Sequence, residues 1–182
     1  MKFTVLGSGS TGNAVLISSG KTRVLVDAGM SAREIVRRMN EMGVAAEDID
    51  AVLVTHEHSD HIAGLRVLLR SIKCPVYISG ETEESYYRTR AGRENGESEG
   101  AKRRNALEGR TVEINSNRFF RIGDIDFEPF SVPHDAVDNF GFSAVCDGVK
   151  VATLMDFGHI NDLIRDKLRD CDAMVVESNH DR

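Results

Sequence analysis

The segment His56-Glu57-His58-Ser59-Asp60-His61 places four side chains of metal-ligand type in one short stretch. The run before it, residues 49–55, is apolar and rich in β-branched residues, which predicts a buried strand. The run after it, residues 62–69, has the apolar spacing of a helix. The segment therefore lies on a predicted strand-to-helix loop, where a rigid scaffold can present side chains to a cleft.

The spacing within this segment predicts two directions of ligation. Alternate positions of an extended chain point the same way, so we expect His56 and His58 to bind one ion together. Asp60 and His61 follow as the chain turns into the helix, and we expect them to point toward a second, neighbouring ion. Imidazoles with a carboxylate are a donor set typical of zinc-type sites. The alternative is a solvated polar loop, since His and Asp are ordinary loop residues.

Two further strand ends carry residues of the same chemistry. His134 follows an apolar strand predicted over 125–132, and Asp156 follows another predicted over 149–155. A single His or Asp at a strand end is more often structural than a ligand. Beside the cluster at 56–61, both become candidate metal ligands.

The order of the predicted elements indicates an α/β fold with two sheets and helices outside them. Besides those named above, strands are predicted at 2–6, 13–18, 22–26, 75–79, 110–114, 119–122, 142–146 and 173–176, and helices after the cap Ser31 and at 161–169. A chain of 182 residues with 41% hydrophobic content can bury one core, so we expect one domain over 1–182.

Residues 81–109 differ from the rest because they are highly charged and contain few apolar side chains. We expect a helix that leads into a charged surface excursion. The alternative is a basic rim that contacts phosphates. Acidic residues interleave with the basic ones, which favours the first interpretation.

The net charge of −6 argues against a protein coated in positive charge. It does not exclude a nucleic-acid substrate, because bound divalent cations would make a cleft less negative. Cys74, Cys146 and Cys171 are widely spaced and odd in number, which is typical of reduced thiols in a cytosolic protein. No stretch is long enough to span a membrane and no secretion signal is evident, so we expect a cytoplasmic location without a membrane partner. The sequence does not indicate an oligomeric state.

These residues together resemble the metallo-β-lactamase fold superfamily of metal-dependent hydrolases, over nearly the whole chain. The resemblance implies an αββα sandwich of two mixed β-sheets with outer helices. It also implies two divalent ions held by six metal ligands: His56, His58 and His134 for the first ion, Asp60 and His61 for the second, and Asp156 as the bridge. Asp27 would be the buried aspartate that supports the motif loop and orients its imidazoles.

Three further stretches, at 6–13, 131–135 and 177–181, are similar to the YycJ-like (WalJ-like) bacterial branch, whose members are regarded as DNA exonucleases acting on duplex ends. The first stretch is rich in glycine and serine, which permits close approach of a phosphate to its backbone. Ser8, Ser10 and Asn13 are therefore candidate phosphate-binding residues, although such loops are also common turns.

One departure from the superfamily concerns its late histidine, which completes the second metal site beyond the last residue of this sequence. His180 is the candidate substitute, and His159 is a weaker one. We therefore expect the chain to be C-terminally short, to lack the last elements of the usual domain, and to bind the second ion weakly.

The predicted function is that of a metal-dependent hydrolase, specifically a phosphodiesterase or DNA exonuclease-like nuclease. Two zinc or manganese ions would activate a water as hydroxide, and Asp60 would be the catalytic residue that orients it. One alternative is a hydrolase of a thioester, lactone or lactam, which needs the same metal core. The other is an inactive metal-binding module.

Overall fold

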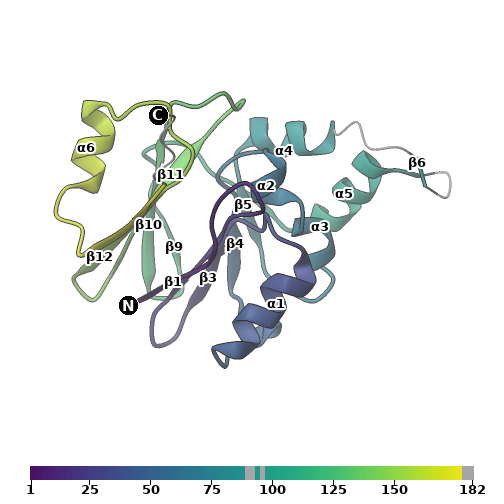
Figure 1. Cartoon of the computed structure of the whole chain (residues 1–182), viewed down its shortest axis with the longest axis horizontal. Coiled ribbons are helices and arrows are strands. Elements are labelled where there is room, and N and C mark those ends of the chain that lie inside the picture. The colour runs from purple at the N-terminus through teal and green to yellow at the C-terminus, as the bar shows by residue number, and fades with distance from the viewer. Residues whose placement is uncertain (89–92, 95–96, 178–182) are drawn as a thin grey trace.

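The computed structural model describes residues 1–88, 93–94 and 97–177, with two mixed β-sheets as its centre (Figure 1). The first sheet has the order β1 (Lys2–Gly7), β2 (Ala14–Ser18), β3 (Arg23–Val26), β4 (Ala51–Leu53), β5 (Val76–Ile78) and β8 (Thr111–Glu113). The second has the order β13 (Ala173–Val176), β12 (Val149–Leu154), β11 (Phe140–Cys146), β10 (Ile125–Ser131) and β9 (Phe120–Ile122). A short antiparallel pair joins β6 (Arg93–Glu94) to β7 (Glu97–Ser98).

Each sheet combines both kinds of strand pairing. The pairs β1–β2 and β2–β3 are antiparallel, whereas β3–β4, β4–β5 and β5–β8 are parallel. In the second sheet, β9 to β12 pair antiparallel and β13 joins β12 in parallel. This arrangement brings the carboxyl ends of β3, β4, β10 and β12 to one end of the molecule.

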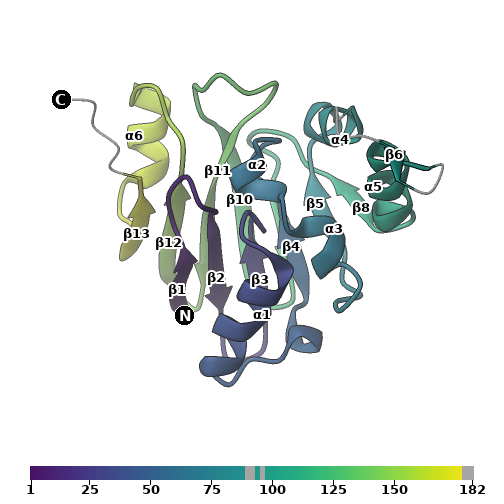
Figure 2. The ribbon, with the colours of Figure 1, turned by 45° about the vertical axis from the view of Figure 1, so that its right-hand side comes forward.

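Helices cover the outer faces of both sheets (Figure 2). The first sheet is covered by α1 (Ala32–Glu41), α3 (Leu65–Leu68), α4 (Gly80–Tyr87) and α5 (Glu99–Leu107), and the second by α6 (Asp162–Leu168). A 3₁₀ turn, η1 (Ala46–Asp48), leads into β4, and the short helix α2 (Ser59–Ile62) comes after β4. The predicted αββα sandwich is therefore confirmed.

Alternation along the strands explains the layers. Leu16, Leu25 and Val52 pack toward the helices, in the same cluster as helix residues such as Ile35 and Leu68. Their neighbours point to the opposite face and pack against the second sheet, as Ile17, Val24, Leu53, Phe127 and Phe142 show. Strands that are buried on both faces read as continuous apolar runs, which is how they appear in the sequence.

The predicted helix over 62–69 is instead two short helices, α2 and α3, separated at Gly64. A Cβ on Gly64 would lie 2.0 Å from the carbonyl oxygen of Met30, and the Gly64 N–H donates to the Ala28 carbonyl. The loop after β3 thus packs tightly against this point. The close approach requires glycine and interrupts the helix there.

The two ends of the 81–109 segment are helices, and each packs on the core. Tyr86 of α4 and Leu107 of α5 are both 1% exposed and belong to the cluster beneath the first sheet. The helix expected at the start of the segment is thus α4, and a second helix, α5, which was not predicted, closes it. Residues 89–92 and 95–96 lie outside the described part of the chain. Within the described residues, no helix combines the length and apolar character that a membrane crossing needs.

Candidate metal centre

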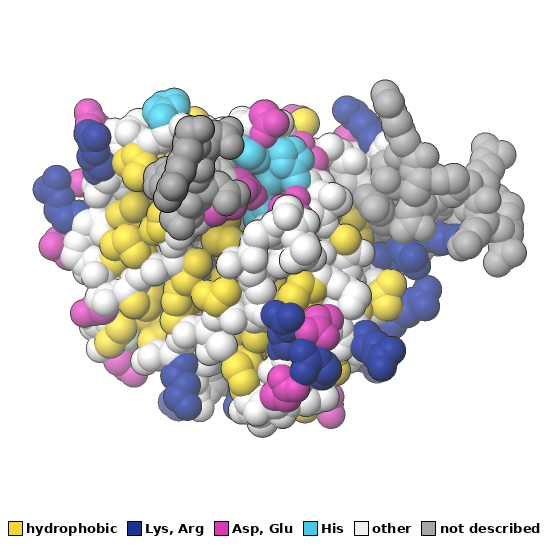
Figure 3. Space-filling view, viewed as in Figure 1, with side chains coloured by type: hydrophobic (Ala, Val, Ile, Leu, Met, Phe, Trp, Pro, Cys, Tyr) yellow, Lys and Arg dark blue, Asp and Glu magenta, His cyan; other side chains and the backbone are white. Residues whose placement is uncertain are grey.

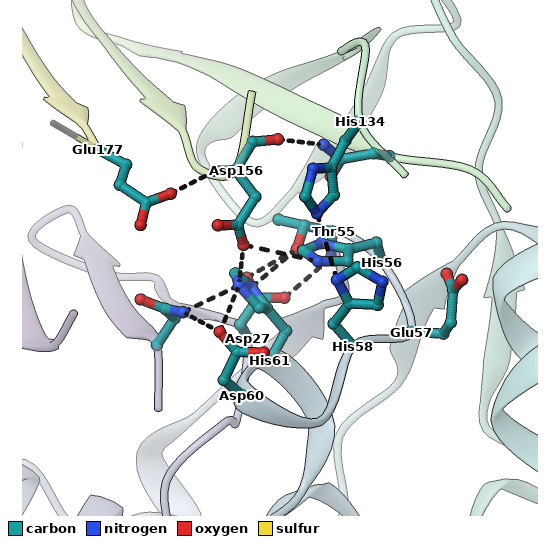
Figure 4. Close-up of polar contacts among 12 residues, drawn as sticks. Asp27, Thr55, His56, Glu57, His58, Asp60, His61, His134, Asp156 and Glu177 are labelled. Atoms are coloured by element: carbon teal, nitrogen blue, oxygen red, sulfur yellow. Dashed lines mark hydrogen bonds and ion pairs between the residues drawn. The ribbon is translucent and has the colours of Figure 1, made fainter. Parts of the chain in front are cut away.

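The side chains singled out in the sequence meet where four strands end (Figure 4). Asp27 follows β3, the His56–His61 segment follows β4, His134 follows β10 and Asp156 follows β12. The two sheets thus contribute to one site from opposite sides. Parallel alignment of these strand ends is what brings residues so distant in sequence together.

Three imidazoles form the first group. Ring nitrogens of His56, His58 and His134 all lie within 4.8 Å of one another. His134 Nε2 lies 3.2 Å from His58 Nδ1. His56 is fully buried, whereas the other two are half-buried and open toward solvent. The structure therefore brings together the three residues predicted for the first ion.

A second group shares one member with the first. His56, His61 and Asp156 place ligand atoms within 4.8 Å of one another. The Asp156 carboxylate contacts His61 Nε2 directly, and its Oδ2 lies 3.6 Å from His56 Nε2. Asp60 stands at the edge of this group, with Oδ2 3.7 Å from His61 Nε2.

The ring of His56 shows that a divalent cation fits here. Its Nδ1 lies 3.0 Å from the Thr55 hydroxyl, but its Nε2 is buried and makes no hydrogen bond to any described residue. Burial, together with the neighbouring His61 and His58, lowers the pKa of His56 to about 2, so the ring is neutral. A buried nitrogen lone pair without a donor, facing other ligand atoms, matches a metal-binding position.

Asp27 holds His61 from the side away from the group. Its Oδ2 lies 2.7 Å from His61 Nδ1, and its two oxygens accept hydrogen bonds from the Thr55 N–H and hydroxyl, each at 2.9 Å. Burial lowers the pKa of His61, but the Asp27 and Asp156 carboxylates outweigh it and raise the value to about 10. Asp27 therefore fixes the ring so that Nε2 faces Asp156, which is the position predicted for a supporting aspartate.

Both aspartates at these strand ends adopt a left-handed backbone conformation. The φ angle is 63° at Asp27 and 45° at Asp156. Aspartate tolerates this region better than most residues with a side chain. The turn redirects each side chain from its strand into the site.

Asn13 occupies a different place from the one predicted for a phosphate-binding residue. It is 2% exposed, and its backbone N–H donates to the Asp60 carbonyl at 2.6 Å. Its side-chain oxygen accepts from the Gly9 N–H, and its Nδ2 lies 3.2 Å from Asp60 Oδ2 and 2.9 Å from His61 Nε2. Asn13 thus ties the glycine-serine loop to the motif.

The other two candidates of that loop, Ser8 and Ser10, are exposed. Ser8 lines a cavity of about 280 Å³, together with Met155, which precedes Asp156, and Glu177, which accepts the Asp156 N–H. The loop is therefore next to the cluster. His180 lies outside the described residues, and His159 is exposed and belongs to neither ligand group.

Three supporting residues were not predicted. Thr55 contacts Asp27, as described above. Glu177 accepts the Asp156 N–H at 2.9 Å, and the Asn139 side chain donates to the Asp156 carbonyl at 2.9 Å. Burial and the nearby Asp156 carboxylate raise the pKa of Glu177. Thr55 is adjacent to the motif, and Glu177 begins the stretch 177–181 named above, but neither position indicated a supporting role, and Asn139 had no signal in the sequence.

Comparison with known proteins places this site in context. A family profile described as "Beta-lactamase superfamily domain" matches residues 22–182. Exodeoxyribonuclease WalJ of Streptococcus pneumoniae serotype 2 (strain D39 / NCTC 7466) is 34% identical over 99% of this chain and 63% of the relative. Exodeoxyribonuclease YycJ of Bacillus anthracis is 32% identical over 100% of this chain and 64% of the relative. The chain thus spans just under two thirds of the length of these two relatives.

Solved structures agree on the architecture. The Rm3 metallo-β-lactamase superposes with a TM-score of 0.68 over 88% of this chain and 61% of that protein, at 20% identity. At this level of identity the likeness concerns the fold alone.

Proposed function

The chain belongs to the beta-lactamase superfamily, and on this basis we propose that it is a metal-dependent phosphodiesterase, specifically a DNA exonuclease-like nuclease. The observation that carries the proposal is the pair of ligand groups that meet at the buried His56 Nε2. The names of the two relatives supply the substrate class.

His56 belongs to both ligand groups, but its single free lone pair can bind only one ion. Each ligand must therefore be assigned to one of the two ions. We assign His56, His58 and His134 to the first ion. His61 and Asp60 then remain for the second, and Asp156 lies between both. The imidazole-rich first group suits zinc, whereas the carboxylates of the second also suit manganese.

Bound divalent ions would supply a water of lowered pKa and would neutralise charge on a phosphate. The chain's own residues set the geometry around that chemistry. Asp60, with 29% of its side chain exposed, lies at the edge of the second group, and we propose that its carboxylate orients a nucleophilic water. Asp27 keeps the His61 ring in one orientation, and Glu177 and Asn139 hold the backbone of Asp156.

The glycine-serine loop supports a phosphate substrate. Ser8 is exposed at a cavity that reaches Glu177, beside Asp156. We propose that Ser8 and Ser10 contact a phosphate next to the scissile bond. The three cysteines are free, which agrees with a reducing compartment, and we propose the cytoplasm as the location.

The decisive experiment incubates the chain with end-labelled single- and double-stranded DNA, with manganese or zinc. We expect stepwise shortening from an end that EDTA abolishes. Asp60→Ala should reduce the rate of DNA cleavage by orders of magnitude with an unchanged circular dichroism spectrum. The control Asp162→Ala, at an exposed residue of α6, should keep the wild-type rate.

Two results would contradict the proposal. Hydrolysis of a thioester or lactam without cleavage of any phosphodiester would favour the carbonyl hydrolase. A metal-dependent rise in melting temperature without turnover of any of these substrates would favour a binding module.

A further inference from the structure

A positively charged hollow, here called the α3–α5 groove, lies on the helical layer that also carries the motif. It has a volume of about 470 Å³ and is lined by five cationic residues: Arg66, Arg70, Lys73, Lys102 and Arg110. Among the residues whose side chains the structure describes, no carboxylate lines it. In a chain with 29 acidic and 23 basic residues, such a concentration of one sign needs a reason.

Three elements build the groove. Arg66, Arg70 and Lys73 follow one another at intervals of four and three, so they share one face of α3 and of the turn that continues it. Lys102 faces them from α5. Figure 3 shows Lys and Arg side chains gathered on the right-hand side of the molecule, in the region of these helices.

Arg110 forms the remaining wall and is held in place by the backbone. Its Nη1 donates to the carbonyl oxygens of Leu69 and Ile72, at 3.0 and 2.9 Å. Both acceptors are backbone carbonyls, and within the described part of the chain Arg110 forms no ion pair with a carboxylate. Because Lys102 and Arg110 come from outside α3, the cluster is not explained by cations at the carboxyl end of that helix.

We propose that the α3–α5 groove binds the phosphate backbone of a nucleic-acid strand whose end lies at the metal centre. This inference rests on the proposed function. Arg66 comes five residues after His61, so the groove begins next to the motif helix α2 and extends along α3 toward Lys73 and Arg110, which precede β5 and β8. The far end of the groove lies at the amino ends of β5 and β8, so a strand that advances about 3.4 Å per nucleotide would follow α3 over several nucleotides. Contacts from Arg and Lys to phosphates carry no sequence information, so this binding is independent of sequence.

The test uses charge reversal of two exposed residues, Arg70→Glu/Lys73→Glu. The control is Lys21→Glu/Arg169→Glu, which changes the charge equally at two residues outside the groove. Binding of a fluorescein-labelled oligonucleotide is followed by anisotropy in EDTA, so that nothing is cleaved, over a range of salt. We expect the groove variant to bind at least about tenfold more weakly than the control. A plot of the logarithm of its DNA-binding constant against the logarithm of salt concentration should have a slope shallower by about 1 to 2.

A small chromogenic substrate separates the groove from the chemistry. Bis(p-nitrophenyl) phosphate reaches only the metal centre, so the groove variant should hydrolyse it at the wild-type rate with manganese. Equal binding of DNA by the groove and control variants, or no binding by the wild type, would overturn the groove proposal. If the wild-type protein hydrolysed no phosphodiester at all, the proposed function would instead be refuted. If Arg70→Glu/Lys73→Glu melts lower than the control, the milder Arg70→Ala/Lys73→Ala variant replaces it in the same comparison.

Discussion

Asp27 Oδ2 lies 2.7 Å from His61 Nδ1, although 34 residues separate the two in the chain. Aspartate and histidine are usually exposed, but here Asp27 is 1% exposed and His61 is fully buried. The contact between them therefore lies inside the protein. It leaves Nε2 of His61 directed at Asp156. The ring can therefore enter the site in one orientation only, which fixes the geometry before any ion binds.

Asp27→Asn should weaken binding of the second ion by about 10- to 100-fold, the usual effect of losing a carboxylate behind a ligating imidazole. Affinity for the first ion should change less, because among the described interactions Asp27 contacts none of its three histidines directly and reaches His56 only through the Thr55 hydroxyl. Isothermal titration with zinc measures both sites. Asp126→Asn, at an exposed ion pair with Arg121, is the matched control. Unchanged affinity at both sites would refute the supporting role.

Substitution of single histidines should remove the two ions separately. His58→Ala removes a ligand of the first group only, and His61→Ala removes one of the second only. We expect each variant to lose about one bound ion, counted by native mass spectrometry. His159→Ala, at an exposed histidine outside both groups, should bind as many ions as the wild type. Equal losses for all three variants would show that the groups are not separate sites.

Gly29→Ala should disrupt the centre through the backbone. A Cβ at this position would lie 1.5 Å from the carbonyl oxygen of Asp60, so the motif loop must move. We expect a loss of about 3 kcal/mol in the free energy of unfolding, measured by urea denaturation, together with weaker zinc binding. Gly20→Ala meets no atom within 4 Å and should leave both quantities unchanged. A Gly29→Ala protein as stable as Gly20→Ala would contradict the packing described here.

Removal of metal should lower the melting temperature. An ion present at 100 times its dissociation constant stabilises the folded state by about 2.7 kcal/mol, which corresponds to about 5 to 10 °C for a chain of this size. Differential scanning calorimetry with zinc and with EDTA measures the difference. His56→Ala, which lacks the residue common to both groups, should show a much smaller difference. An equal shift in that variant would place the stabilising ion elsewhere.

Local patterns in the sequence were sufficient for most of the fold. The apolar run 173–176 is β13, and Ser31 caps α1 by accepting the Glu34 N–H. The motif was visible because its ligands alternate along an extended loop. These features depend on neighbours in the chain, and short-range physical chemistry determines them.

The features that the sequence did not reveal depend on contacts between distant segments. The interruption at Gly64 results from Met30, which approaches from the loop after β3. Asn13 turns inward because the Asp60 carbonyl accepts its N–H. Likewise, the α3–α5 groove joins Arg66 to Arg110 only because β8 pairs beside β5. No local periodicity carries such information.

The positive φ angles of Asp27 and Asp156 affect how any alanine scan of this centre should be interpreted. Alanine at either position would remove a carboxylate and also place a less tolerant residue in a left-handed turn, so two losses would be counted as one. Asparagine tolerates the same turn, but it removes the charge and replaces one acceptor oxygen by an NH2 donor. The difference between the asparagine and alanine variants at one position would thus combine the conformational energy of the left-handed turn with the hydrogen bonds that an amide side chain can still make.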